Sequence, residues 1–167
     1  MRTWLMSPGL SLVITMLSAG QELGEPGSEM GRDEAVAAIR GLRGGVGYDE
    51  TSPEKPIVLV DLVETDVVDA DLVFLKGMTH LRTLYLNGTR VTDAGLQHLK
   101  GLTSLETLRL GASAGDFGGR HRGLAQVTDA GLEHLKGLAN LRVLQLINTQ
   151  VTDTGLEHLK GLANLHL

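Results

Sequence analysis

Residues 81–104 read LRTLYLNGTRVTDAGLQHLKGLTS, and residues 141–164 read LRVLQLINTQVTDTGLEHLKGLAN, with leucines in the same places. Two further copies lie at residues 57–80 and 105–140, the second of which is 36 residues long instead of 24 and so carries a 12-residue insert. Residues 165–167 begin a fifth copy. Self-similarity at such a period indicates a protein built from stacked repeating units.

The spacing of apolar residues changes within each unit. Leu84 and Leu86 alternate with period two, as in a short strand, whereas Leu96, Leu99 and Leu102 are three residues apart, as on one face of a helix. We therefore expect each unit to contain one strand followed by one helix.

Seven apolar positions per unit are too many for one unit to bury, so the units must stack on one another. Strands stack about 4.8 Å apart while helices need about 10 Å, so the stack must curve with its strands inside. The predicted fold class is α/β, a short curved parallel sheet on the concave side with helices on the convex side. In repeat two, Thr92-Asp93 is expected to cap the helix start, and Lys100-Gly101 suits its end.

The pattern LxxLxLxxTxVTDAGLxHLKGLxx resembles the 24-residue leucine-rich repeats of bacterial proteins and is similar to those of F-box substrate adaptors. The resemblance covers residues 57–167 and implies a leucine-rich-repeat solenoid that binds proteins. No F-box segment is recognisable upstream, so an adaptor role in ubiquitin ligation does not carry over. The polar position after each strand is Thr65, Thr89 or Thr149, whose hydroxyls could bond neighbouring backbone. Repeat three has Ala125 there if the insert lies before it, and we then expect this ladder of hydroxyls to be interrupted.

The chain upstream of the repeats divides into three segments. Residues 1–20, with Arg2, an apolar run and small residues before Gln21, are typical of a signal peptide, although a disordered or miscalled N-terminus is the alternative. Residues 21–31 are rich in Gly, Glu and Pro and are expected to form a flexible linker. Residues 32–56 should form an N-terminal cap, with a helix begun by Asp33, a short strand, and a turn into the strand at Ile57. This order predicts a secreted or periplasmic protein, with cytoplasmic location as the alternative.

Composition excludes several functional classes. The absence of cysteine excludes disulfides, thiolate metal sites and thiol catalysis. A net charge of −5 argues against a nucleic-acid partner, and no apolar run reaches the ~18 residues that stable membrane insertion needs. Gly44, Gly45 and Gly47 match no phosphate-binding fingerprint and indicate a turn.

Two recurring polar positions suggest chemistry but have simpler interpretations. Repeats two to four have histidine at one position, where repeat one has Phe74; the histidines are His98, His134 and His158. Equivalent helices lie about 10 Å apart, which is too far for zinc–nitrogen bonds of about 2.1 Å. We therefore expect a row of solvent-exposed histidines rather than a metal site. The aspartates that recur at the helix starts are interpreted as caps rather than as catalytic pairs; they are Asp69, Asp93, Asp129 and Asp153. We expect no enzyme activity, metal or cofactor.

The candidate recognition surface is the outward side of the strands, where residues between the core leucines vary from unit to unit. The central column is Asp61, Tyr85, Arg109 and Gln145, and the flanking columns are Leu59, Thr83, Thr107 and Val143 on one side and Val63, Asn87, Gly111 and Ile147 on the other. Tyr85 and Arg109 are the expected anchors, because such side chains dominate interface hot spots. Neutral drift is the alternative explanation of the variation.

The insert of repeat three is the second candidate site. It is glycine-rich and contains Phe117, Arg120, His121 and Arg122. Loops on rigid scaffolds often bind ligands, and these cations suggest an anionic ligand. A tolerated lengthening of the loop is the alternative, since it costs little free energy.

The function expected from these observations is a non-catalytic protein-interaction module with an unknown protein ligand. The alternative is an uncapped fragment, or an accessory piece of a larger repeat array, with a structural role only. In that case repeat four should expose core leucines or a strand edge and allow self-association.

Overall fold

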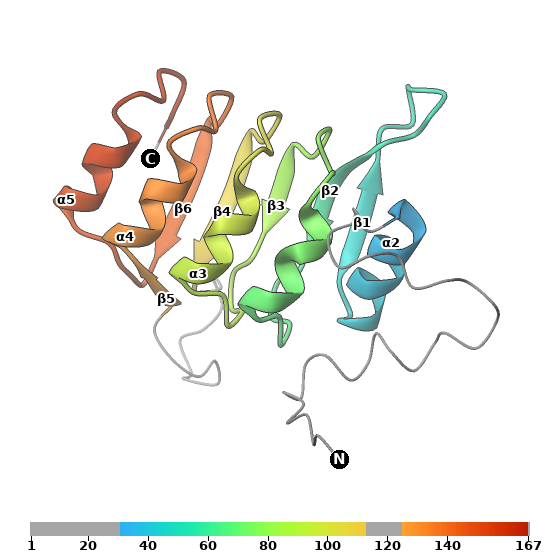
Figure 1. The fold of residues 1–167 in the computed structure, drawn as a ribbon, viewed down its shortest axis with the longest axis horizontal. Helices are drawn as coiled ribbons and strands as arrows, with labels where there is room; N and C mark the ends of the chain where they lie inside the picture. The colour runs from blue at the N-terminus through green and yellow to red at the C-terminus, as the bar shows by residue number, and fades with distance from the viewer. Residues whose placement is uncertain (1–30, 113–124, 167) are drawn as a thin grey trace, which may run out of the picture.

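The computed structural model describes residues 31–112 and 125–166. Short helices lie on one side of a mostly parallel sheet (Figure 1), which confirms the expected α/β architecture. The expected signal peptide, nearly all of the linker and most of the insert lie outside the described residues. The elements in chain order are α2 (Arg32–Gly41), β1 (Gly45–Tyr48), β2 (Ile57–Asp61), the 3₁₀-helix η1 (Asp69–Leu75), β3 (Thr83–Tyr85), α3 (Asp93–Leu96), η2 (Gln97–Leu99), β4 (Thr107–Gly111), β5 (Ala125–Thr128), α4 (Asp129–Leu132), η3 (Glu133–Leu135), β6 (Val143–Ile147), β7 (Thr149–Gln150), α5 (Asp153–Leu156) and η4 (Glu157–Leu159).

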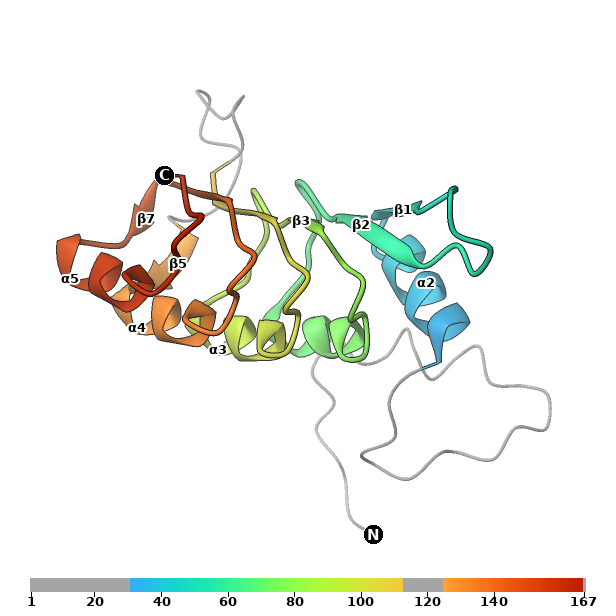
Figure 2. The same cartoon turned by 90° about the horizontal axis from the view of Figure 1, so that it is seen from above.

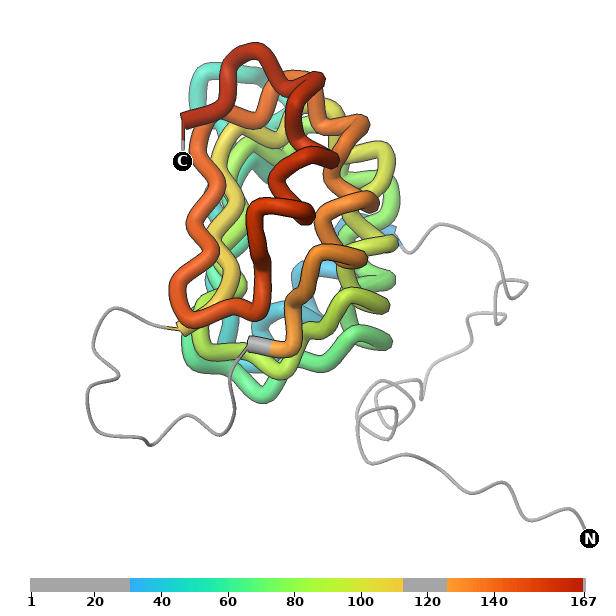
Figure 3. The backbone as a smooth tube through the Cα atoms, turned by 90° about the vertical axis from the view of Figure 1, so that its left-hand side faces the viewer, coloured from blue at the N-terminus to red at the C-terminus, as the bar shows by residue number. Residues whose placement is uncertain are grey.

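The main sheet has the strand order β1-β2-β3-β4-β6. Strands β2, β3, β4 and β6 are parallel and come from repeats one to four in turn, whereas β1 pairs antiparallel with β2. The helices of successive repeats lie side by side behind the sheet (Figures 2 and 3). The small parallel sheet of β5 and β7, which joins repeats three and four, was not anticipated from the sequence.

The core consists of the recurring apolar positions. All seven of them are buried in repeat two, and so are their seven counterparts in repeat three. In repeat four, Leu146, Val151 and Leu156 are only partly buried, because no described residue covers them on the side away from repeat three. The free edge of β6 carries one isolated bridge, from Val143 to His166. In repeat two the buried set is Leu81, Leu84, Leu86, Val91, Leu96, Leu99 and Leu102.

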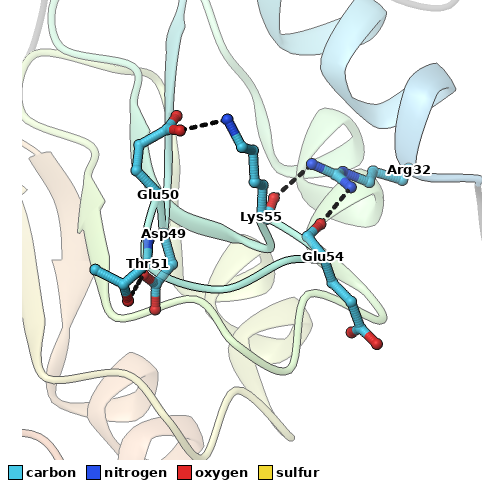
Figure 4. Close-up of polar contacts among 6 residues, drawn as sticks. All are labelled: Arg32, Asp49, Glu50, Thr51, Glu54 and Lys55. Atoms are coloured by element: carbon cyan, nitrogen blue, oxygen red, sulfur yellow. Dashed lines mark hydrogen bonds and ion pairs between the residues drawn. The ribbon is translucent and has the colours of Figure 1, made fainter.

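Helix α2 and the β1–β2 hairpin close the other end of the sheet. The helix begins at Arg32, with Gly31 rather than Asp33 at its N-cap. The Arg32 guanidinium donates to the carbonyls of Glu54 and Lys55 at 3.1 and 2.5 Å, which fastens the helix to the hairpin turn (Figure 4). Phe74 is buried where later repeats have histidine, because η1 lies against α2 there.

Adjacent repeats are joined by a recurring side-chain contact, which we call the Asp–Thr clasp. The carboxylate of Asp93 accepts hydrogen bonds from the Thr128 backbone N–H at 2.8 Å and from its hydroxyl at 2.7 Å. The Thr128 hydroxyl oxygen in turn accepts from the Ala130 N–H at the start of α4. The same contact joins Asp69 to Thr92 and Asp129 to Thr152.

The clasp corrects the expectation that these aspartates cap their own helices. The side chains of Thr92, Thr128 and Thr152 cap α3, α4 and α5. The aspartates of repeats one to three reach into the next repeat instead. The hydrogen bonds from Thr152 lower the pKa of Asp129, the backbone N–H contributing most. The carboxylate of Asp153, in repeat four, has no such partner within the described ranges.

A glycine makes room for each clasp. A Cβ atom on Gly131 would lie 2.2 Å from Oδ1 of Asp93, and Gly95 and Gly155 are equally close to their aspartates. Repeat one has Asp71 at this position, where it accepts from the Val68 N–H at 2.9 Å. A glycine is needed only where an aspartate arrives from the preceding repeat.

Candidate binding face of the parallel sheet

The helices cover one face of the main sheet, and no described element covers the other (Figure 2). We call this uncovered face the strand face. Its side chains alternate with buried core residues along each strand, so it presents three positions of each repeat. They are Leu59, Asp61, Val63, Thr83, Tyr85, Asn87, Thr107, Arg109, Gly111, Val143, Gln145 and Ile147.

The strand register brings the central column together. Asp61 pairs with Tyr85, Tyr85 with Arg109, and Arg109 with Gln145. The Arg109 guanidinium lies over the Tyr85 ring at 4.7 Å from its centre, within the range of a cation–π interaction. The two expected anchors therefore form one unit on neighbouring strands.

Exposed apolar side chains concentrate on this face. Four large hydrophobic side chains are exposed in the described part of the chain, and three of them belong to the strand face: Val63, Val143 and Ile147, at 36, 42 and 38%. The flanking residues Thr83 and Thr107 are half-buried and in register with Val143. Exposed aliphatic groups next to an aromatic–arginine pair are typical of a protein-binding surface.

Asn87 differs from the other predicted binding residues, because it is only 6% exposed. Its side-chain amide lies across β4 and donates to the carbonyls of Leu110 and Ala112, both at 3.3 Å, and to Oε1 of Gln145 at 3.5 Å. With its side chain engaged in the fold, Asn87 offers a partner little surface.

The role of Asn87 follows from the insert. In the other repeats the carbonyl equivalent to that of Leu110 accepts from a threonine hydroxyl three residues later, at 2.7 Å from Thr65, 2.8 Å from Thr89 and 3.0 Å from Thr149. Repeat three lacks this threonine, and Asn87 of the preceding repeat supplies the donor. The threonines thus bond within their own repeat, and the interruption expected at Ala125 is bridged from repeat two.

Gly111 marks the point where the chain leaves the sheet toward the insert. Its φ is 95°, a left-handed value that favours glycine, and a Cβ atom there would lie 1.9 Å from the Ile147 carbonyl oxygen. Repeats one, two and four have their left-handed residue one position later, at Glu64, Gly88 and Asn148. The insert residues proposed to bind an anion, Phe117, Arg120, His121 and Arg122, lie outside the described residues.

The helix side of the molecule carries the histidine row. His98 is partly buried, and burial, followed by the positive charge of Lys76, lowers its pKa. No group of three or more His, Cys, Asp or Glu side chains suited to a metal ion occurs among the described residues. An open cavity of about 280 Å³ lies between α2 and η1, away from the strand face, and includes Arg32, Phe74 and Lys76 in its lining.

None of the helices within residues 31–112 and 125–166 is long and apolar enough to cross a membrane. The sequence matches no known family model and no curated protein. The candidate site therefore stands on the geometry of the strand face.

Proposed function

We propose that this chain is a leucine-rich-repeat solenoid that binds a protein partner on its strand face. The stacked parallel strands, the helices on one side only and the repeated Asp–Thr clasp support the repeat architecture. The resemblance of residues 57–167 to leucine-rich repeats points the same way.

One observation carries the assignment of the binding face. Three of the four most exposed large hydrophobic side chains, and the stacked Tyr85–Arg109 pair, share a sheet face that no helix covers. Apart from Asn87 and Gln145, which bond to each other, the outward residues of repeats two to four make no side-chain hydrogen bond to the fold in the described structure. Folding does not require their identity, and binding explains an aromatic–cationic–aliphatic surface better than neutral drift does.

The test is capture of a partner from the source cells with the full chain and matched variants. We expect one protein to be retained by the unchanged chain and by Lys136→Ala on the helix side, but lost with Tyr85→Ala and with Arg109→Ala. Each strand-face change should weaken the isolated complex at least about tenfold, or about 1.4 kcal/mol, by calorimetry. Equal retention by all four proteins contradicts the assignment.

A second candidate role is structural and rests on repeat four. Its partly buried Leu146, Val151 and Leu156, together with the carboxylate of Asp153, which has no partner among the described residues, form a surface suited to packing against another repeat-like unit. Light scattering with Leu156→Glu as the comparison tests this role. Association of the unchanged chain that is lost in the variant supports it, and a monomer at all concentrations contradicts it.

The place of action follows from residues 1–20, which we propose direct export. Mass spectrometry of the protein from its source cells should find a mature N-terminus near Gln21. An intact Met1 on protein in the cytoplasm contradicts this proposal.

A further inference from the structure

The charge of Arg109 has no counterpart on the strand face. The guanidinium is exposed, and none of the ion pairs within the described ranges includes it. Within the described part of the chain, its side chain contacts the ring of Tyr85. The outward residues of both neighbouring strands, β3 and β6, are uncharged. The carboxylate of Asp61 is two strands away, about 10 Å at the usual strand spacing, and accepts from the Val63 N–H at 3.0 Å.

The contact with Tyr85 prepares Arg109 to receive an anion. A guanidinium held over a ring keeps N–H groups available and has lost part of its rotational freedom before a partner arrives. Those N–H groups match a carboxylate in a two-point hydrogen bond. The position is therefore suited to a carboxylate.

Aliphatic groups flank the same position. Val143 and Ile147 stand on β6, on either side of Gln145, which is the register partner of Arg109. Residues two apart on a strand are about 7 Å from each other, the spacing of alternate side chains in an extended segment. Gly111, the register partner of Ile147, has no side chain to cover it. An occupant thus meets one cation between two apolar contacts.

We propose, as an extension that rests on the proposed function, that the strand face recognises a peptide segment. An Asp or Glu side chain of this segment pairs with Arg109, while neighbouring aliphatic or aromatic side chains pack on Val143 and Ile147. A free inorganic anion should bind here much more weakly. It contacts a single cation and no apolar group, whereas the peptide segment contacts both. The net charge of the chain, −5, further disfavours general attraction of anions and leaves recognition to this local pair.

The experiment is selection of a displayed random peptide library on the full chain. We expect enriched peptides to carry Asp or Glu beside Leu, Ile, Val or Phe. A synthetic peptide from the selection should bind at least about tenfold more weakly to Arg109→Ala, and a Glu→Gln peptide should lose as much on the unchanged chain. The two changes combined should lose little more than either alone, because both remove one interaction. Lys100→Ala, on the helix side, serves as the control and should leave affinity unchanged.

Further variants separate the two proposals. Arg109→Glu should reverse the selection toward Lys- and Arg-bearing peptides, and Ile147→Asp should abolish binding of the acidic ones. Peptides that depend on Tyr85 and Val143 but carry no acidic residue overturn this inference and leave the proposed function standing. If no selected peptide depends on any strand-face residue, both fail. Displacement of the peptide by an equal concentration of inorganic phosphate shows a simple anion site and overturns the inference.

Discussion

Replacing Asp93 by alanine should destabilise the fold by about 2 kcal/mol, since it removes the Asp–Thr clasp between repeats two and three. The Thr128 N–H and hydroxyl lose acceptors at 2.8 and 2.7 Å. A hydrogen bond to a charged group contributes about 1.5–3 kcal/mol, and the two bonds share one carboxylate, so their losses do not simply add. Solvent can reach the hydroxyl more easily than the backbone N–H, which keeps the total near the value of one strong bond.

Repeat four supplies the matched control. Asp153 occupies the same position, at the start of α5, but its carboxylate has no partner in the described structure. Asp153→Ala should therefore change the free energy of unfolding by no more than about 0.5 kcal/mol. Any general effect of losing an aspartate at the first turn of the helix is the same in both variants, so the difference between them isolates the clasp.

Gly131→Ala tests the same contact from the other side. Helix propensity alone favours alanine by up to about 1 kcal/mol, so a loss of stability has to come from the clash with Asp93, whose Oδ1 would lie 2.2 Å from the new Cβ. We expect a net loss of about 2–4 kcal/mol, reduced by at least about 1 kcal/mol when Asp93 is already alanine. Gly137→Ala, with no atom within 4 Å of its Cβ, should be neutral or stabilising.

The measurement is urea unfolding of the full chain followed by circular dichroism, with stabilities compared at a common slope. Equal losses for Asp93→Ala and Asp153→Ala would refute the view that the clasp stabilises the junction. Additive losses for Asp93→Ala and Gly131→Ala would refute the direct contact between them.

Two further predictions concern single side chains. Burial and the charge of Lys76 lower the pKa of His98, so protonation favours the unfolded chain, and the free energy of unfolding should fall as the pH drops below about 6.5. An NMR titration checks this. A His98 pKa at or above 6.5, or a pKa that Lys76→Met leaves unchanged, contradicts the prediction. Asn87→Ala removes the donor to the Leu110 carbonyl and should cost about 1 kcal/mol in urea unfolding, whereas an unchanged midpoint would show that water serves equally well.

The core and the order of elements could be predicted because both depend on short-range periodicity. Leu84 and Leu86 had to face one side of a strand, and Leu96 and Leu99 one side of a helix, whatever the rest of the chain did. The alignment of Tyr85 with Arg109 followed, since units of one length that stack in register place equivalent residues on neighbouring strands.

The clasp could not be predicted in the same way, because Thr-Asp before a helix is compatible with capping by either residue. The choice depends on contacts with a residue 23 or 35 positions away. The sequence nevertheless held a signal. In repeats two to four, glycine recurs two residues after the aspartate, and the preceding repeat carries an aspartate that can reach it. Repeat one has no repeat before it and has Asp71 in place of the glycine.

Asn87 shows how a local change alters the candidate site of a neighbour. By pattern it belongs with Val63 and Ile147, both exposed, and nothing in repeat two distinguishes it. The difference lies in repeat three, which lacks the threonine whose counterparts meet the equivalent carbonyl in the other repeats. Predicting its burial required knowing that the Leu110 carbonyl on β4 lies within reach of Asn87, which follows β3.

The proposed function therefore separates stability from recognition along each strand. The buried positions and the clasp hold the repeats together, while Tyr85, Arg109 and Val143 face outward and contribute little to folding. Replacing these three residues should change binding without changing the urea midpoint, and replacing Asp93 should do the reverse. Asn87 is the exception among the strand-face residues, because its side chain donates hydrogen bonds to the backbone of the next repeat and so stabilises the fold. A strand-face variant that loses its partner and keeps its stability thus reports on recognition alone.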